Sequence, residues 1–66
     1  MYTLNTIREL LAQPSGTLAL DTETGTAYRL SDGQLFAQTP NAAAIRLDVE
    51  DLDLDEEFQT SVVWVG

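Results

Sequence analysis

An Asp-Gly pair at positions 32 and 33, set between two stretches of alternating apolar and polar residues, limits the fold of this chain more than any other feature. Asp-Gly favours the two-residue turn of a β-hairpin, because both central residues of that turn need positive φ angles. The turn would pair Ser31 with Gln34, Leu30 with Leu35 and Tyr28 with Ala37. We therefore predict two antiparallel strands over residues 28–37.

The turn before this hairpin can be drawn in two ways that differ by one residue. A four-residue loop over residues 22–25 sets Leu18 against Arg29. A three-residue loop over residues 23–25 pairs Leu20 with Tyr28 and Leu18 with Leu30. A one-residue slip moves a whole strand's side chains to the other face, so burial of the leucines favours the shorter loop. Gly25 would then take the left-handed position of that loop.

The three strands have one apolar face in this register. We expect the core face to hold Leu18, Leu20, Tyr28, Leu30, Leu35 and Ala37. The other face would hold Thr17, Ala19, Asp21, Ala27, Arg29, Gln34, Phe36 and Gln38. Phe36 is the unusual residue there, and it is expected either to lie against Arg29 or to mark a contact patch.

An N-terminal helix is predicted over residues 4–13, to cover the core face. Its apolar stripe is Leu4, Ile7, Leu10 and Leu11, at helical spacing. Two starts are open: Thr3 caps the helix, or Thr6 and Glu9 form a capping box and start it later. Pro14 and Gly16 end it.

The second half of the chain predicts further strands. Residues 41–44 could begin a short helix, and alternation from Ile45 to Val49 predicts a strand. The alternation breaks near Glu50 and Asp51, which requires a bulge, a turn or a short helical turn. Residues 60–65 are rich in β-branched and aromatic residues and predict a last strand. The expected fold is one α+β domain over residues 1–66, a helix on an antiparallel meander of four to five strands.

The charge of the chain predicts its class of partner. Its 66 residues include eleven acids, three arginines and no lysine, for a net charge of −8. Such a surface repels nucleic acid and anionic membranes and attracts basic proteins. Because 44% of the residues are apolar and regularly spaced, a disordered acidic tail is not expected.

Several functions lack the residues they need. The chain has no histidine, cysteine or lysine, and Ser15, Ser31 and Ser61 have no base beside them in the sequence. We expect no enzyme activity, no cofactor and no required metal. No stretch approaches the roughly 20 apolar residues that span a bilayer, and the first eleven residues lack a signal-peptide pattern. The expected location is therefore the cytoplasm.

Seven of the ten residues at positions 48–57 are acidic. If this run is extended, Asp51, Asp53 and Asp55 project on one side at intervals of about 6.6–6.8 Å, close to the phosphate spacing of a DNA strand. The alternative is an acidic loop that only keeps the protein soluble. The run also begins like a calcium-binding EF-hand loop, but Glu56 replaces the required glycine and Val62 the closing glutamate.

The arginines and aromatic residues have simpler expected roles. Arg8, Arg29 and Arg46 are too few for a nucleic-acid footprint, and we expect them to pair with acids of the same chain. Phe58 and Trp64 are expected in the core, although a tryptophan near the chain end could instead anchor an interface.

In size, acidity, lack of catalytic residues and α+β pattern the chain resembles the small phage-encoded anti-CRISPR proteins and other phage DNA mimics. The residues that carry the resemblance, and the expected partner-binding site, are Asp48, Glu50, Asp51, Asp53, Asp55, Glu56 and Glu57, with Asp21, Glu23 and Asp32 at strand ends. The opening residues 4–16 are similar to a type I anti-CRISPR. The resemblance implies that the protein blocks the basic DNA channel of a CRISPR surveillance complex, in the subunit that reads the PAM, within the host cytoplasm.

Two other classes stay open. One is an antitoxin or immunity protein that inhibits a basic nuclease by the same electrostatics. The other is a structural phage protein whose acidity serves only solubility. The chain is expected to act as a monomer or weak homodimer, without direct contact to nucleic acid or membrane.

Overall fold

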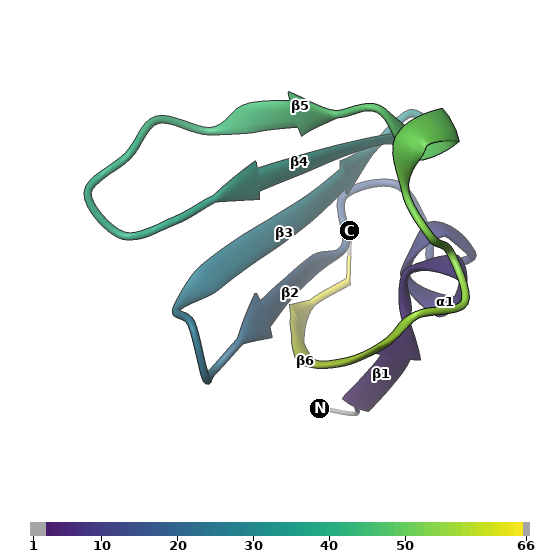
Figure 1. Ribbon diagram of the computed structural model, residues 1–66, viewed down its shortest axis with the longest axis horizontal. Helices are drawn as coiled ribbons and strands as arrows, with labels where there is room; N and C mark the ends of the chain where they lie inside the picture. Colours follow the sequence, from purple (N-terminus) through teal and green to yellow (C-terminus); the bar gives the residue numbers. More distant parts are fainter. Residues whose placement is uncertain (1–2, 66) are drawn as a thin grey trace.

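One antiparallel sheet and a short helix make up the fold in a computed structural model that describes residues 3–65. In chain order the elements are β1 (Thr3–Thr6), α1 (Ile7–Leu11), β2 (Leu18–Asp21), β3 (Thr26–Ser31), β4 (Gln34–Gln38), β5 (Ile45–Leu47), the 3₁₀ helix η1 (Val49–Asp51) and β6 (Glu57–Trp64). The sheet has six strands in the order β1-β6-β2-β3-β4-β5, more than the four to five expected (Figure 1). The expected combination of a helix and an antiparallel sheet is confirmed.

The N-terminal helix is shorter than predicted, and a strand precedes it. Residues 3–6 form β1, which pairs with β6, so the apolar side chain of Leu4 is buried from a strand and not from a helix. Of the two predicted starts, Thr6 is the correct one: its hydroxyl oxygen accepts a hydrogen bond from the Glu9 amide at 3.2 Å. An N-cap residue keeps an extended backbone, and Thr6 has φ −143° and ψ 160°, which is compatible with its place at the end of β1.

The predicted Asp32–Gly33 hairpin is confirmed. Ser31 pairs with Gln34, Leu30 with Leu35 and Tyr28 with Ala37. Asp32 and Gly33 have φ angles of 51° and 78°, the positive values that a tight hairpin turn between twisted strands needs. Asp32 also donates its amide proton to the Ser15 hydroxyl at 3.0 Å, which ties the turn to the segment after α1.

The register of β2 differs from the preferred prediction by one residue. Leu18 pairs with Arg29 and Leu20 with Ala27, which is the register of the four-residue loop over residues 22–25. Gly25 does take the left-handed conformation, at φ 75°, and its amide donates to the Asp21 carbonyl at 2.8 Å. The choice of the shorter loop was wrong because it assumed that the largest apolar residues of β2 face the core.

Small residues face the core instead, one just before β2 and one within it. Thr17 and Ala19 are fully buried, whereas Leu18 and Leu20 are half-buried on the opposite face of the sheet. The large side chains above them come from other elements: Leu10 of α1 and Leu35 of β4 are also fully buried. Because α1 lies over this part of the sheet, a close approach favours small side chains beneath it.

The second half of the chain follows the predicted pattern with two differences. Residues 41–44 are an exposed loop and not a helix, with Asn41 at φ 65°. The break in alternation after β5 is η1. It is a short helical turn, which was one of the three predicted alternatives. The last strand begins at Glu57, three residues earlier than predicted.

Candidate functional site

The chain that joins β5 to β6 is the candidate site. We name residues 48–57, which include the first residue of β6, the acidic strap. β5 lies at one edge of the sheet, while β6 lies next to the opposite edge. The connection must therefore cross a face of the sheet to reach β6. Figure 1 shows it running from η1 past α1 to the start of β6.

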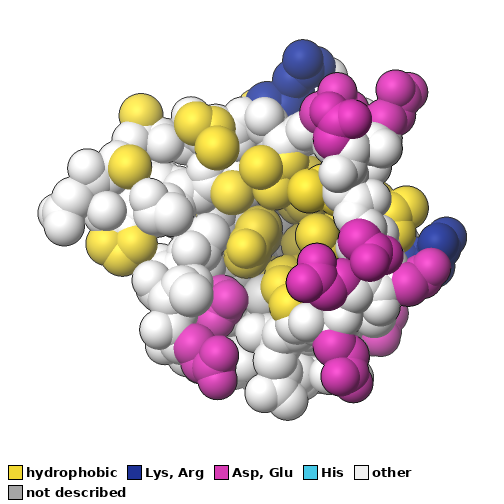
Figure 2. Space-filling view, in the orientation of Figure 1, with side chains coloured by type: hydrophobic (Ala, Val, Ile, Leu, Met, Phe, Trp, Pro, Cys, Tyr) yellow, Lys and Arg dark blue, Asp and Glu magenta, His cyan; other side chains and the backbone are white. Residues whose placement is uncertain are grey.

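The acidic strap has an apolar side and an acidic side. Val49 and Leu52 are half-buried and pack against the buried core cluster, and Leu54 is half-buried as well. All seven acids are exposed: Asp48, Glu50, Asp51, Asp53, Asp55, Glu56 and Glu57. The burial of the apolar residues directs the carboxylates outward. Figure 2 shows acidic side chains along this side of the molecule.

The acidic strap is not extended, so the expected row of equally spaced aspartates does not form. Asp51 ends η1, and residues 54–55 lie in a turn. Two of the carboxylates shape this backbone. Asp48 caps η1 by accepting from the Glu50 amide at 3.1 Å, and Asp53 accepts from the Asp55 amide at 3.1 Å. Aspartate side chains favour such turns because they accept from amides two residues ahead.

An ion pair attaches the acidic strap to α1. The guanidinium of Arg8 donates from Nε to Oδ1 of Asp55 at 2.8 Å and from Nη2 to Oδ2 at 3.2 Å. The backbone amide of Arg8 donates to the Leu54 carbonyl at 3.1 Å. The hydrogen bonds from Arg8, followed by its charge, hold the pKa of Asp55 below its ordinary value of 3.8. The same pair raises the pKa of Arg8.

The structure gathers eight of the ten predicted partner-binding residues at or beside the acidic strap. Leu35 of β4 pairs with Leu47 of β5. Asp32, in the turn before β4, and Asp48, directly after β5, therefore lie at the same end of the sheet. At the opposite end of β3, Asp21 is the last residue of β2 and Glu23 lies in the loop that follows it. Asp21 there accepts from the Glu23 amide at 2.9 Å, which orders the loop. These two residues therefore do not form one surface with Asp32 and Asp48.

The two C-terminal aromatic residues expected in the core have different surroundings. Phe58 is half-buried and makes an edge-to-face contact with Tyr28, with ring centroids 5.6 Å apart, so the core role is confirmed for Phe58. Trp64 is 67% exposed, and its expected core role is wrong. Trp64 pairs with Leu18 across the β6–β2 ladder, so both side chains lie on the face of the sheet opposite the core.

Neither a metal site nor a membrane-spanning helix is found within the part of the chain that the structure describes. No group of three or more acidic, histidine or cysteine side chains in residues 3–65 could hold a metal ion. The EF-hand-like run has acids at its first, third and fifth positions, Asp51, Asp53 and Asp55, and the last two are hydrogen-bonded within the chain. Among the same residues, no helix has the length and apolar character to cross a membrane.

Comparison of the chain with protein-family models, curated proteins and solved structures finds no match to any of the three.

Proposed function

We propose that the acidic strap inserts into a basic groove of a partner protein, a groove that otherwise binds nucleic acid. The observation that carries the proposal is the outward display of seven exposed carboxylates on one apolar-anchored segment. Only Asp55 among them has a basic partner in residues 3–65. Like charges at this density repel one another and destabilise the isolated fold, and a cationic groove would relieve that repulsion.

The proposed mimicry of DNA depends on the density of negative charge and not on the spacing of phosphates. The folded acidic strap lacks the regular interval of a DNA strand, but it concentrates negative charge on one exposed segment. The hydrogen bonds of Asp48 and Asp53 and the ion pair of Asp55 hold that segment in place before it binds. A preorganised surface loses less conformational entropy on binding, and complementary charge speeds association.

The partner that the resemblance suggests is the PAM-reading large subunit of a type I CRISPR surveillance complex. Arginines and lysines line such a channel to hold the DNA backbone. A protein bound there would exclude DNA without any chemistry, so the proposed role is that of an anti-CRISPR inhibitor in the host cytoplasm.

Two charge variants of the chain provide the test. The strap variant carries Glu50→Gln, Asp51→Asn and Glu56→Gln, three acids whose side chains accept no hydrogen bond within residues 3–65. The control variant carries Glu9→Gln, Asp21→Asn and Glu23→Gln, outside the acidic strap. Both lose three negative charges. In the control variant the amide oxygens of the new side chains can still accept the hydrogen bonds that Asp21 and Glu9 accept from backbone amides.

The experiment is affinity capture from nuclease-treated bacterial lysate with the wild type and both variants. The proposal predicts that wild type and control variant retain a common protein, that the strap variant loses it, and that double-stranded DNA elutes it. The identity of that protein separates a CRISPR subunit from a nuclease. If the strap variant retains the same proteins as wild type, the acidic strap serves solubility alone.

A further inference from the structure

The face of the sheet opposite the acidic strap has a different composition from the rest of the molecule. Paired positions across five neighbouring strands place one row of residues on this open face. From β6 to β5 the row reads Trp64, Leu18, Arg29, Phe36 and Arg46. Directly paired residues of an antiparallel sheet project to the same face, so aromatic, aliphatic and cationic side chains alternate along the row.

The charge of this row is opposite to the charge of the molecule. Two of the three arginines lie in it, in a chain with eleven acids. Arg8 is paired with Asp55, but neither Arg29 nor Arg46 forms an ion pair within residues 3–65. Both are exposed. Although acids are abundant in this chain, these two guanidinium groups form no ion pair with them in the part that the structure describes. Both groups lie beside aromatic residues and remain available to bind an anion.

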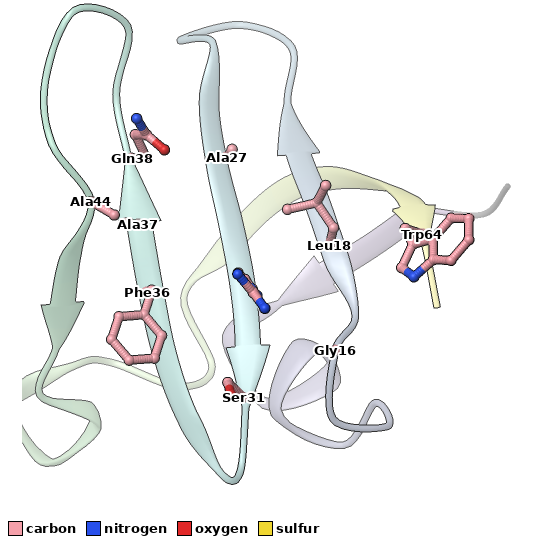
Figure 3. A pocket seen from close by; sticks show the side chains of 10 residues that line it. Gly16, Leu18, Ala27, Ser31, Phe36, Ala37, Gln38, Ala44 and Trp64 are labelled. Atoms are coloured by element: carbon pink, nitrogen blue, oxygen red, sulfur yellow. The ribbon is translucent and has the colours of Figure 1, made fainter. Parts of the chain in front are cut away.

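A depression of about 710 Å³ lies over the middle of the row. Its lining contains small residues, among them Gly16, Ala27 and Ala44, with Phe36 and Trp64 as the aromatic members. Arg29 is the only charged residue of the lining. Figure 3 shows Phe36 projecting from β4 and Trp64 from β6, with Leu18 and Ala27 between them.

We propose that this depression binds a small ligand with a planar aromatic body and one anionic group. The volume lies in the range of small-molecule sites, which combine apolar walls with few polar groups. Phe36 and Trp64 are three strand spacings apart, about 14 Å, which leaves room for a body of two or three rings over Leu18 and Ala27. The guanidinium of Arg29 is a planar fork that suits a carboxylate, sulfonate or phosphate.

The electrostatics of the whole molecule select a small ligand over nucleic acid. A polyanion would approach a chain of net charge −8 against repulsion at every phosphate beyond the row. A ligand with one negative charge meets that repulsion once and can form its hydrogen bonds directly with Arg29. The inference is independent of the proposed function, because the acidic strap covers the other face of the sheet.

The probe is 8-anilinonaphthalene-1-sulfonate, and its uncharged counterpart with the same aromatic skeleton is N-phenyl-1-naphthylamine. Dye fluorescence gives the affinity, and the NMR signal of the indole Nε1–H of Trp64, the chain's single tryptophan, gives the location. We expect the sulfonate to bind and to shift the Trp64 signal. The uncharged dye should bind at least about tenfold more weakly, as expected for loss of a charge-assisted hydrogen bond.

The variant Arg29→Gln identifies the anion contact, and Arg8→Gln is its matched control with the same change of net charge. Arg29→Gln should weaken the sulfonate about tenfold and leave the uncharged dye unchanged, whereas Arg8→Gln should leave both affinities unchanged. Heteronuclear spectra confirm that both variants are folded. The proposal is overturned if the sulfonate does not shift Trp64, if both dyes bind equally, or if Arg29→Gln binds the sulfonate as wild type does.

Discussion

At the scale of single residues, two buried threonines test how this small core satisfies its polar groups. Thr17 is fully buried, and its hydroxyl donates to the Pro14 carbonyl at 2.7 Å. Thr60 is 1% exposed, and its hydroxyl has no hydrogen-bond partner among residues 3–65. A buried hydroxyl without a partner loses its hydration and gains nothing in return.

The same substitution should have opposite effects at these two positions. Thr60→Val replaces the hydroxyl by a methyl group of similar size and should stabilise the fold by about 1 kcal/mol. Thr17→Val removes a made hydrogen bond and should destabilise it by about 1 kcal/mol. Urea unfolding of both variants measures the two changes. A loss of stability in Thr60→Val would mean that its hydroxyl is satisfied, for example by a water molecule.

The ion pair between Arg8 and Asp55 has a consequence for pH. Because Arg8 lowers the folded pKa of Asp55 below 3.8, the stabilisation from this carboxylate is present above about pH 4 and is lost as the pH falls through the lowered pKa. Arg8→Gln should return the pKa of Asp55 towards 3.8. An NMR titration of the Asp55 carboxyl carbon measures the change, and an unaltered pKa in the variant would show that Arg8 does not set it.

At the scale of elements, local turn chemistry was predictable and the position of β2 was not. The Asp32–Gly33 turn fixes its own register through the φ angles it needs, and every predicted pair across it is present. The loop before β3 admits two registers, and the decision between them depends on what covers the sheet. That cover includes Leu10 and residues of the acidic strap, whose positions are tertiary and leave no local signal in residues 17–25.

The same limit explains the other errors. Leu4 fits a helical stripe and a strand equally well, because a short apolar pattern does not distinguish the two. Pairing of β1 with β6, far away in the sequence, decides for the strand. Of the candidate site, the acids were evident from composition. Arg29 and Phe36 were correctly predicted on the open face, whereas Leu18 was expected in the core because the register of β2 was wrong.

The corrected register predicts which leucines matter for stability. Leu35 is fully buried, so Leu35→Ala should destabilise the fold by about 2–5 kcal/mol. Leu20 is half-buried on the open face, so Leu20→Ala should destabilise it by clearly less. Chemical unfolding ranks the two variants. An equal or larger loss in Leu20→Ala would restore the three-residue loop and contradict the register of β2.

At the scale of the whole molecule, the two faces of the sheet have different surroundings and different charge. One is covered by α1 and the acidic strap, and the other carries the row from Trp64 to Arg46. The acidic strap concentrates repulsion that the isolated fold must withstand. The strap variant should therefore have a higher melting temperature than wild type at low salt.

That difference should shrink at 0.15 M salt, where exposed charges are screened beyond about 8 Å. Thermal melts of wild type and strap variant at both salt concentrations provide the measurement. A lower melting temperature in the strap variant at low salt would mean that these carboxylates stabilise the isolated fold. Binding to a partner would then have no charge repulsion to relieve.

The most direct test of the proposed function is the displacement of labelled double-stranded DNA from the captured partner, followed by fluorescence anisotropy. Wild type and the control variant should displace the DNA at similar concentrations, and higher salt should weaken both, because the contact is between opposite charges. The strap variant should need at least about tenfold more protein, as expected when charged contacts at an interface are lost. Equal displacement by all three proteins at every salt concentration would contradict the assignment of the acidic strap as the binding surface.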